Sequence, residues 1–259
     1  MTLDFKIAII TGASRGIGRA IALELAADGI GVVLTARDQQ ALDNVAGEAK
    51  KAGAPATLVI ATDLSEASAP DRVVAQSIEE FGRLDILVNN AGDTKRGDFL
   101  ELTDEDHLSG FALKYHAMVR FCRAGWPHLA KTSGSIINIS GIGAHTPESV
   151  FTIGGPVNSA IINFTKALSR RAPQDGLRVN TVSPGHIVTE RLNSRIEAYA
   201  GKEDIPYQEA KERIRVEREI RRFGEPEEIA AMVAFLCSDR GAYVHGATII
   251  VDGGATPGI

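Results

Sequence analysis

The sequence has few of the features that mark secreted, membrane or nucleic-acid-binding proteins. Its two cysteines, Cys122 and Cys237, sit in apolar helical patterns without metal-ligand spacing, so we expect buried thiols, a reducing compartment and no metal site. Acidic residues outnumber basic ones by 33 to 28, which leaves no surplus positive charge for nucleic acid or an anionic membrane. No apolar run approaches the roughly 18 residues of a membrane span, and the N-terminus lacks the pattern of a secretory signal. These absences predict a cytoplasmic globular protein with neither nucleic acid nor membrane as a partner.

The sequence does contain short apolar runs that alternate with longer amphipathic stretches throughout. This alternation is typical of βαβ units in a parallel sheet, and the runs show little polar alternation because helices cover both faces. We see no linker or repeat, so we expect one α/β domain over residues 1–259 with a doubly wound, seven-stranded parallel sheet. The predicted strands span residues 6–11, 32–36, 57–61, 86–89, 135–140, 178–183 and 248–251.

One connection is much longer than the others. Residues 189–222, between the sixth and seventh predicted strands, form a charged helical stretch that exceeds a usual connection. We expect this stretch to fold over the C-terminal edge of the sheet as a substrate lid beside the ligand crevice.

A glycine-rich turn, TGASRGIG at residues 11–18, follows the first strand and opens a helix. Glycines without Cβ atoms let backbone N–H groups approach a pyrophosphate, and the helix N-terminus adds partial positive charge. Such a turn can need glycine for packing alone, but its place after the first strand favours a dinucleotide site.

This turn is similar to the TGxxxGxG signature of the short-chain dehydrogenase/reductase family. NNAG at residues 89–92, the Pro-Gly turn at 183–185 and DGG at 252–254 follow in the family's order and extend the resemblance over nearly the whole chain. The resemblance implies a Rossmann-type fold that binds a nicotinamide dinucleotide and acts on a small molecule. From the glycine turn we expect contacts from Gly12, Ser14, Arg15, Gly16, Ile17 and Gly18. The resemblance implies that Asp63 and Leu64 flank the adenine, that Asn90, Ala91 and Gly92 line the adenine ribose side, that Ser140 is a cofactor-side residue, and that Pro184, Gly185, Ile187 and Thr189 hold the nicotinamide amide and the diphosphate.

The choice between NAD and NADP depends on the end of the second strand, where an acidic residue would repel a 2′-phosphate. Arg37 stands there, and Arg15 lies in the glycine turn, so two guanidinium groups can pair with a phosphate dianion. Both arginines could instead be solvated surface charges. Asp38, the next residue, could favour NAD, but it directly precedes a helical stretch and is better explained as the N-cap of that helix. We therefore expect NADP.

The catalytic pattern of the family is missing. The resemblance implies a Tyr, a Lys four residues after it and a Ser thirteen residues before it, but the aligned positions hold Gly154, Asn158 and Gly141. A fourth family position, an Asn in the preceding helix, falls at Lys114, or at Leu113 if the following loop is ungapped.

Two consequences follow from this replacement. Pro156 directly after Gly155 disfavours a helical conformation at that glycine, so we expect the helix to begin later than in relatives. Loss of the phenol should also open space beside the nicotinamide.

A Tyr-x-x-x-Lys match at Tyr207 and Lys211 lies in the expected lid, where such spacing is common by chance.

Reduction of a carbonyl leaves an alkoxide that needs a proton, so a substitute acid is required if the protein is a reductase. The candidates near the site are Lys95, Arg96, Lys114, His145, Glu148, Thr152 and His186. We expect Lys95, Arg96, His145 and Glu148 to be solvated and His186 to pack on the edge of the cofactor. Lys114 stands near an apolar helix stripe, where an inward lysine is costly unless paired or functional. We favour Lys114, with an ordinary surface lysine as the alternative.

The sequence therefore supports two leading hypotheses. The first is an NADP(H)-dependent oxidoreductase with Lys114 as an unusual proton donor. The second is a catalytically silent NADP(H)-binding sensor or assembly protein, and a purely structural surface role is a third. Residues 241–254 resemble the family's last strand and DGG turn, which implies a homotetramer or homodimer that covers an apolar edge strand.

Overall fold

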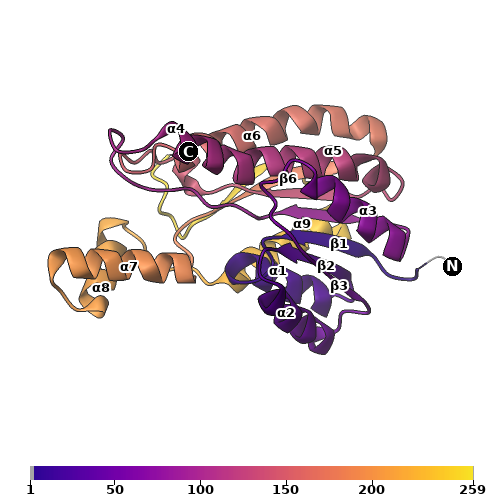
Figure 1. Ribbon diagram of the computed structural model, residues 1–259, viewed down its shortest axis with the longest axis horizontal. Coiled ribbons are helices and arrows are strands. Elements are labelled where there is room, and N and C mark those ends of the chain that lie inside the picture. The colour runs from indigo at the N-terminus through magenta and orange to yellow at the C-terminus, as the bar shows by residue number, and fades with distance from the viewer. Residues whose placement is uncertain (1–2, 259) are drawn as a thin grey trace.

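A computed structural model describes residues 3–258 of the protein as seven parallel strands in one sheet, with helices on both faces (Figure 1). The strands lie in the order β3-β2-β1-β4-β5-β6-β7. Their bounds are β1 (Ile7–Thr11), β2 (Gly31–Ala36), β3 (Thr57–Ala61), β4 (Ile86–Asn89), β5 (Ser135–Ile139), β6 (Arg178–Pro184) and β7 (Thr248–Val251). The expected doubly wound, seven-stranded sheet is confirmed, and no strand end differs from its predicted position by more than one residue.

Helices cover the two faces of the sheet in two groups. α1 (Gly16–Ala27), α2 (Gln39–Ala52) and α9 (Pro226–Cys237) bury their apolar faces in one core cluster. α3 (Ala69–Phe81), α5 (Ala117–Ala130) and α6 (Gly154–Arg171) contribute to a second cluster on the other face. α4 (Asp104–Phe111) precedes a single π-helical segment, Ala112–His116, which continues into α5. Because both faces are covered, the central strands β1, β2, β4 and β5 are buried along their whole length.

The strand order reverses between β1 and β4, which lie side by side although β2 and β3 separate them in the chain. In open α/β sheets, ligands bind outside the carboxyl ends of the strands at such a switch point. The glycine turn after β1 and the NNAG segment after β4 therefore meet there.

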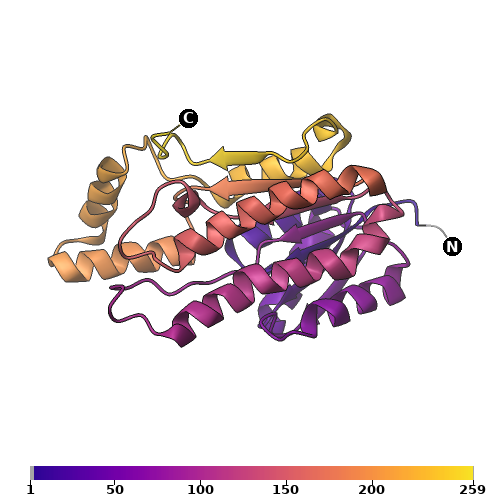
Figure 2. The ribbon, with the colours of Figure 1, turned by 90° about the horizontal axis from the view of Figure 1, so that it is seen from above.

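α7 (Glu190–Glu203) and α8 (Tyr207–Glu217) extend beyond the C-terminal edge of the sheet, as Figures 1 and 2 show. They enclose a small apolar cluster of their own, which includes Leu192, Ile196 and Phe223. The expected helical character of residues 189–222 is confirmed. Within residues 3–258, no helix combines the length and apolar character needed to cross a membrane.

Pro156 does not keep Gly155 out of the helix, contrary to expectation. α6 begins at Gly154, and Pro156 is its third residue. Proline fits there because the first backbone N–H groups of a helix have no intrahelical partner, so its missing N–H costs nothing. The N–H groups of Gly155 and Val157 donate to the carbonyls of Phe151 and Ile153 and hold the first turn together.

Candidate active site

The glycine turn is held against the end of β4 by a short hydrogen-bond network. Gly12 and Gly16 have φ values of +65° and +53°, which favour glycine. A Cβ atom at Gly18 would lie only 2.1 Å from the Gly12 carbonyl oxygen. The Asn90 amide donates to the carbonyls of Thr11 (3.0 Å) and Gly12 (3.2 Å). The Asn90 side chain thus braces the turn.

The remaining family-like motifs meet the same edge of the sheet. The Ala91 N–H donates to the Thr11 hydroxyl at 2.9 Å. A Cβ atom at Gly185 would lie 2.6 Å from Cα of Asp252, so the Pro-Gly turn packs directly on the DGG turn. Thr189 caps α7, and its methyl group would be 3.3 Å from a Cβ atom at Gly16. The structure therefore brings together the four segments that the sequence analysis grouped.

The residues expected at the adenosine end have different surroundings. Asp38 accepts a hydrogen bond from the Ala41 N–H at 3.0 Å, which confirms it as the N-cap of α2. Arg37 is exposed and forms no hydrogen bond or ion pair with any residue in 3–258. Asp63 accepts from the backbone and hydroxyl of Ser65, and these bonds hold the pKa of its carboxyl below the usual range. The Leu64 side chain is buried in the core, while Ser14 and Ile17 are half-buried in the glycine turn.

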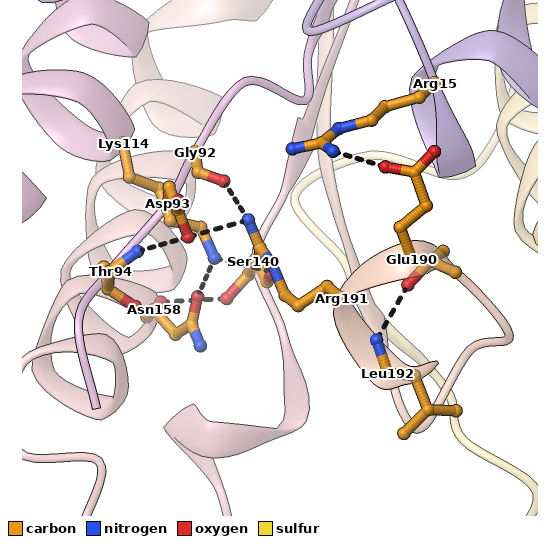
Figure 3. Close-up of polar contacts among 11 residues, drawn as sticks. Arg15, Gly92, Asp93, Thr94, Lys114, Ser140, Asn158, Glu190, Arg191 and Leu192 are labelled. Carbon is orange, nitrogen blue, oxygen red and sulfur yellow. Dashed lines mark hydrogen bonds and ion pairs between the residues drawn. The ribbon is translucent and has the colours of Figure 1, made fainter. Parts of the chain in front are cut away.

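The first turn of α7 contacts both the glycine turn and the NNAG segment, which are expected to bind the cofactor (Figure 3). Glu190 forms an ion pair with Arg15 of the glycine turn. The Arg191 guanidinium donates to the carbonyl of Gly92 at 2.7 Å and to Asp93 at 3.1 Å. Sequence reasoning missed Glu190 and Arg191, because their partners lie about a hundred or more residues away and no local pattern links them.

Lys114 points into the same site and binds two neutral acceptors (Figure 3). Its Nζ lies 2.5 Å from Oδ1 of Asn158 on α6 and 3.1 Å from the carbonyl oxygen of Ser140 after β5. The Ser140 hydroxyl donates to the carbonyl of Asn158 at 3.0 Å, and the Asn158 side chain is almost fully buried. A Cβ atom at Gly92 would lie 2.6 Å from Cγ of Lys114, so glycine there lets the lysine pass. The surface-lysine alternative is therefore wrong.

The surroundings of Lys114 lower the affinity of its amine for a proton. Desolvation by burial, and then the positive charge of Arg191, lower its pKa to about 7, against a smaller opposing effect of Asp93. The amide and carbonyl oxygens bind the ammonium without neutralising its charge. An amine with a pKa near 7 can give or take a proton at neutral pH.

The space beside Gly154 is filled, so the expected opening is wrong. A Cβ atom at Gly154 would lie 2.0 Å from Cζ of Phe151, and one at Gly143 would lie 2.7 Å from Cε1 of the same ring. The Arg96 guanidinium lies over the face of the same ring, 4.2 Å from its centroid. The loop before α6 folds back and places an aromatic ring between the two glycines.

Arg96 and Glu148 are also not solvated, contrary to expectation. Glu148 forms ion pairs with Arg96 and, at 3.1 Å, with Arg218 at the end of α8. Only about a quarter of each of these side chains is exposed, because the loop and the α7–α8 segment cover one another here. Lys95 is exposed and pairs with Asp106, and His145 is exposed, as expected.

The other candidate acids do not match the role of Lys114. His186 is buried, and desolvation followed by the charges of Arg195 and Arg218 lowers its pKa to about 4, so it is neutral at pH 7. The Thr152 hydroxyl is buried without a hydrogen-bond partner among residues 3–258. Tyr207 donates to Asn193 within the α7–α8 segment, which agrees with a chance Tyr-x-x-x-Lys match.

The two cysteines and a cavity beside the DGG turn are separate from the Lys114 network. Cys122 and Cys237 are buried free thiols, and burial raises the pKa of each to about 12. A cavity of about 260 Å³ is lined by His186, Ile187, Arg221, Arg222, Gly224, Glu228, Val251, Asp252 and Gly253, and Lys114 is not part of its lining. Among residues 3–258, no three His, Cys, Asp or Glu side chains are grouped so that they can hold a metal ion.

Known proteins resemble this chain over its whole length. A family model described as enoyl-(acyl carrier protein) reductase matches residues 12–256. Meso-2,3-butanediol dehydrogenase of Serratia marcescens is 34% identical over 259 residues, which cover 99% of this chain and 96% of that protein. A 3-oxoacyl-[acyl-carrier-protein] reductase of Staphylococcus aureus is 31% identical over 258 residues, which cover 96% of this chain and 97% of the relative.

Solved structures agree with these relatives. L-sorbose reductase from Gluconobacter frateurii, complexed with NADPH and L-sorbose, superimposes with a TM-score of 0.94 at 32% identity and covers 100% of this chain and 99% of its own. The NADPH-dependent reductase YwfH, involved in bacilysin biosynthesis, superimposes with a TM-score of 0.92 at 30% sequence identity. The match covers 99% of this chain and 100% of the YwfH chain. Together with the glycine turn and the sheet order, these matches show that the protein belongs to the short-chain dehydrogenase/reductase family of oxidoreductases.

Proposed function

We propose that this protein is an NADP(H)-dependent oxidoreductase that transfers hydride between the cofactor and a carbonyl or alcohol, with Lys114 as the proton donor. The observation that carries this proposal is the position of the Lys114 Nζ, 2.5 Å from Asn158 and 3.1 Å from Ser140 in the site at the end of the sheet. The lowered pKa of this lysine, about 7, suits a general acid at neutral pH.

The residues at the switch point fit a dinucleotide. Gly12 and Gly16 leave the backbone of the turn open to a pyrophosphate, and the N-terminus of α1 adds partial positive charge. Arg37 stands free at the end of β2, and the Asp38 carboxylate is engaged as an N-cap, so a 2′-phosphate meets a guanidinium there. The NADPH-bound L-sorbose reductase and the NADPH-dependent reductase YwfH support the same cofactor. When bound, the nicotinamide supplies or accepts the hydride.

In the proposed mechanism, Lys114 replaces the missing Tyr and Lys. With Gly154, Asn158 and Gly141 at the family's Tyr, Lys and Ser positions, a lysine stands at the family's Asn position and an asparagine at the family's Lys position. In this alignment, which takes Lys114 rather than Leu113 at the Asn position, the ammonium and the amide stand on each other's helices, and the structure has the two groups in contact. Lys114 then gives its proton to the alkoxide oxygen as the carbonyl is reduced, and it takes the proton back in the oxidation direction. Asn158 and Ser140 hold its Nζ in place.

We further propose that the chain is one NADP-binding domain and that residues 189–222 are its substrate lid. The pairing of Glu190 with Arg15 and of Arg191 with Gly92 supports this role, because the first turn of α7 bridges the two segments expected around the cofactor. A lid in this place excludes water from the reacting atoms.

A silent NADP(H)-binding protein is the second candidate, and one observation favours it. The position beside Gly154 holds the phenyl ring of Phe151, which cannot donate a proton. In that case the cofactor site remains intact while Lys114 serves only the packing of α6.

One experiment distinguishes the oxidoreductase from the silent binder, because the two functions predict different results. We expect steady NADPH oxidation by the protein with at least one member of a panel of ketones, aldehydes, quinones and imines. NADPH binding by calorimetry without turnover on any class would instead favour the silent binder, and the absence of both would refute both candidates.

A further inference from the structure

Three guanidinium groups from three segments meet around the carboxylate of Glu148. Arg96 follows the NNAG segment, Arg195 lies on α7, and Arg218 directly follows the last residue of α8. We call these three residues the arginine cluster. They face a single partly buried carboxylate, Glu148, which pairs with Arg96 and Arg218. The only other carboxylate within ion-pair range of the cluster among residues 3–258 is the exposed Glu217, 3.9 Å from Arg218.

The arginine cluster has unsatisfied donors. The side chain of Arg195 forms no hydrogen bond or ion pair with any residue in 3–258. Arg96, Glu148 and Arg218 nevertheless lie close enough for their charges to affect the pKa of its guanidinium. Nε of Arg218 is buried without a partner among the same residues. Glu148, Arg96 and Arg218 are sufficient to join the loop before α6 to the end of α8. The Arg195 guanidinium and Nε of Arg218 therefore make no contact that stabilises the fold. Partly desolvated cations without partners are costly.

The arginine cluster is connected to the proposed reactive site through Phe151. The Arg96 guanidinium stacks on Phe151, whose ring packs beside Gly154 and Gly143. A Cβ atom at Gly143 would in turn lie 3.4 Å from the Asn158 amide that belongs to the Lys114 network. Phe151 and Gly143 thus connect the arginine cluster to the residues around Lys114.

We propose that the substrate carries an anionic group, a carboxylate or a phosphate, and that Arg96, Arg195 and Arg218 bind this group while the carbonyl or alcohol lies at Lys114. Three guanidinium groups opposite one carboxylate leave two positive charges for the ligand, and their planar forks match the oxygens of either anion. Glu148 spaces the arginines and holds two of them in position. This assignment of substrate class rests on the proposed oxidoreductase function.

Direct binding tests the anion site without any turnover. The protein saturated with NADPH is titrated calorimetrically with malonate and, separately, with inorganic phosphate, which distinguishes the two kinds of anion. We expect one of them to bind, and we expect Arg195→Met and Arg218→Met each to weaken that binding at least tenfold. Arg213→Met is the matched control, because this arginine lies on the same helix as Arg218 but pairs with Glu209 and is exposed. It should leave anion binding unchanged.

Three outcomes would overturn the proposal: no binding of either anion, equal binding in all four proteins, or a loss of NADPH affinity in Arg195→Met. The last result would assign the arginine cluster to the cofactor. Anion binding that depends on the cluster, in a protein that oxidises NADPH with no compound, would instead support the site and refute the oxidoreductase function. In an active protein, a 2-keto acid should be reduced at least tenfold more efficiently than its methyl ester, and Arg195→Met should remove that difference.

Discussion

At the scale of single residues, the site depends on the contact between a lysine and an asparagine. Lys114 and Asn158 lie 44 positions apart, and the buried amide oxygen is the nearest acceptor of the ammonium. Because this acceptor is neutral, burial dominates, and the pKa of Lys114 falls to about 7. The resemblance placed both residues near the family's active site from sequence alone, but their direct contact required the fold.

The first prediction concerns pH. Reduction needs the protonated lysine, so its rate should fall as pH rises through about 7, whereas oxidation needs the neutral amine and should become faster over the same interval. Initial rates in both directions, measured from pH 5 to 9, check this. The absence of any transition between pH 5 and 9 in both directions would contradict the assignment.

A matched pair of variants at Asn158 checks the cause of that transition. Asn158→Asp places a carboxylate beside the ammonium and should move the transition to higher pH, whereas Asn158→Leu removes the acceptor and should move it to lower pH. Shifts in the same direction in both variants would show that another group titrates.

The second prediction concerns cofactor choice. Arg37 lies free at the end of β2, so NADPH should bind at least about tenfold more tightly than NADH, or about 1.4 kcal/mol. Arg37→Asp should reverse much of this preference. Arg15 is paired with Glu190, so Arg15→Met should have a smaller effect. Equal affinity of the unmodified protein for both dinucleotides, measured by calorimetry, would refute the phosphate contact.

At the scale of elements, the sequence predicted the strands well because each is a short apolar run covered on both faces. The conformation of Gly155 was predicted wrongly, since Pro156 occupies a first-turn position where it fits a helix that already includes this glycine. The ring of Phe151 beside Gly154 had no sequence signal at all. No local sequence pattern predicts that the loop before α6 folds back onto the start of that helix.

The third prediction concerns this packing. Gly154→Ala should reduce the free energy of unfolding by about 1–3 kcal/mol, because the new methyl group meets the Phe151 ring at 2.0 Å. Gly47→Ala in α2 is the control, since nothing lies within 4 Å of its Cβ position, and it should stabilise the protein by about 0.5–1 kcal/mol. Urea unfolding measures both. Equal changes in the two variants would mean that Phe151 does not fill the space.

At the scale of the whole molecule, topology accounts for what sequence reasoning could and could not predict about the site. Segments that follow parallel strands at a switch point must meet, so the glycine turn and NNAG could be grouped in advance. The pairing of Arg96, Glu148 and Arg218 depends on how the loop before α6 meets α8, and neither segment is a strand end. Their low exposure therefore contradicts the expectation drawn from polar loop sequence.

The fourth prediction concerns assembly. β7 forms one edge of the sheet, and its residues are partly exposed, with Ile250 39% exposed. We propose that a second copy of the chain covers this edge in a homodimer or homotetramer. Light scattering at micromolar concentration should give two or four times the monomer mass of 27.6 kDa. A monomer at that concentration would contradict this proposal.

The fifth prediction tests the role of Lys114 itself. The central measurement is the turnover of Lys114→Met on whichever substrate the unmodified protein reduces. Turnover should fall about a hundredfold or more while the dissociation constant for NADPH stays nearly unchanged, because a general acid is lost and the glycine turn and Arg37 keep their contacts with the dinucleotide. Lys131→Met, at the exposed far end of α5, is the matched control and should retain full turnover. Unchanged turnover in Lys114→Met would contradict the account.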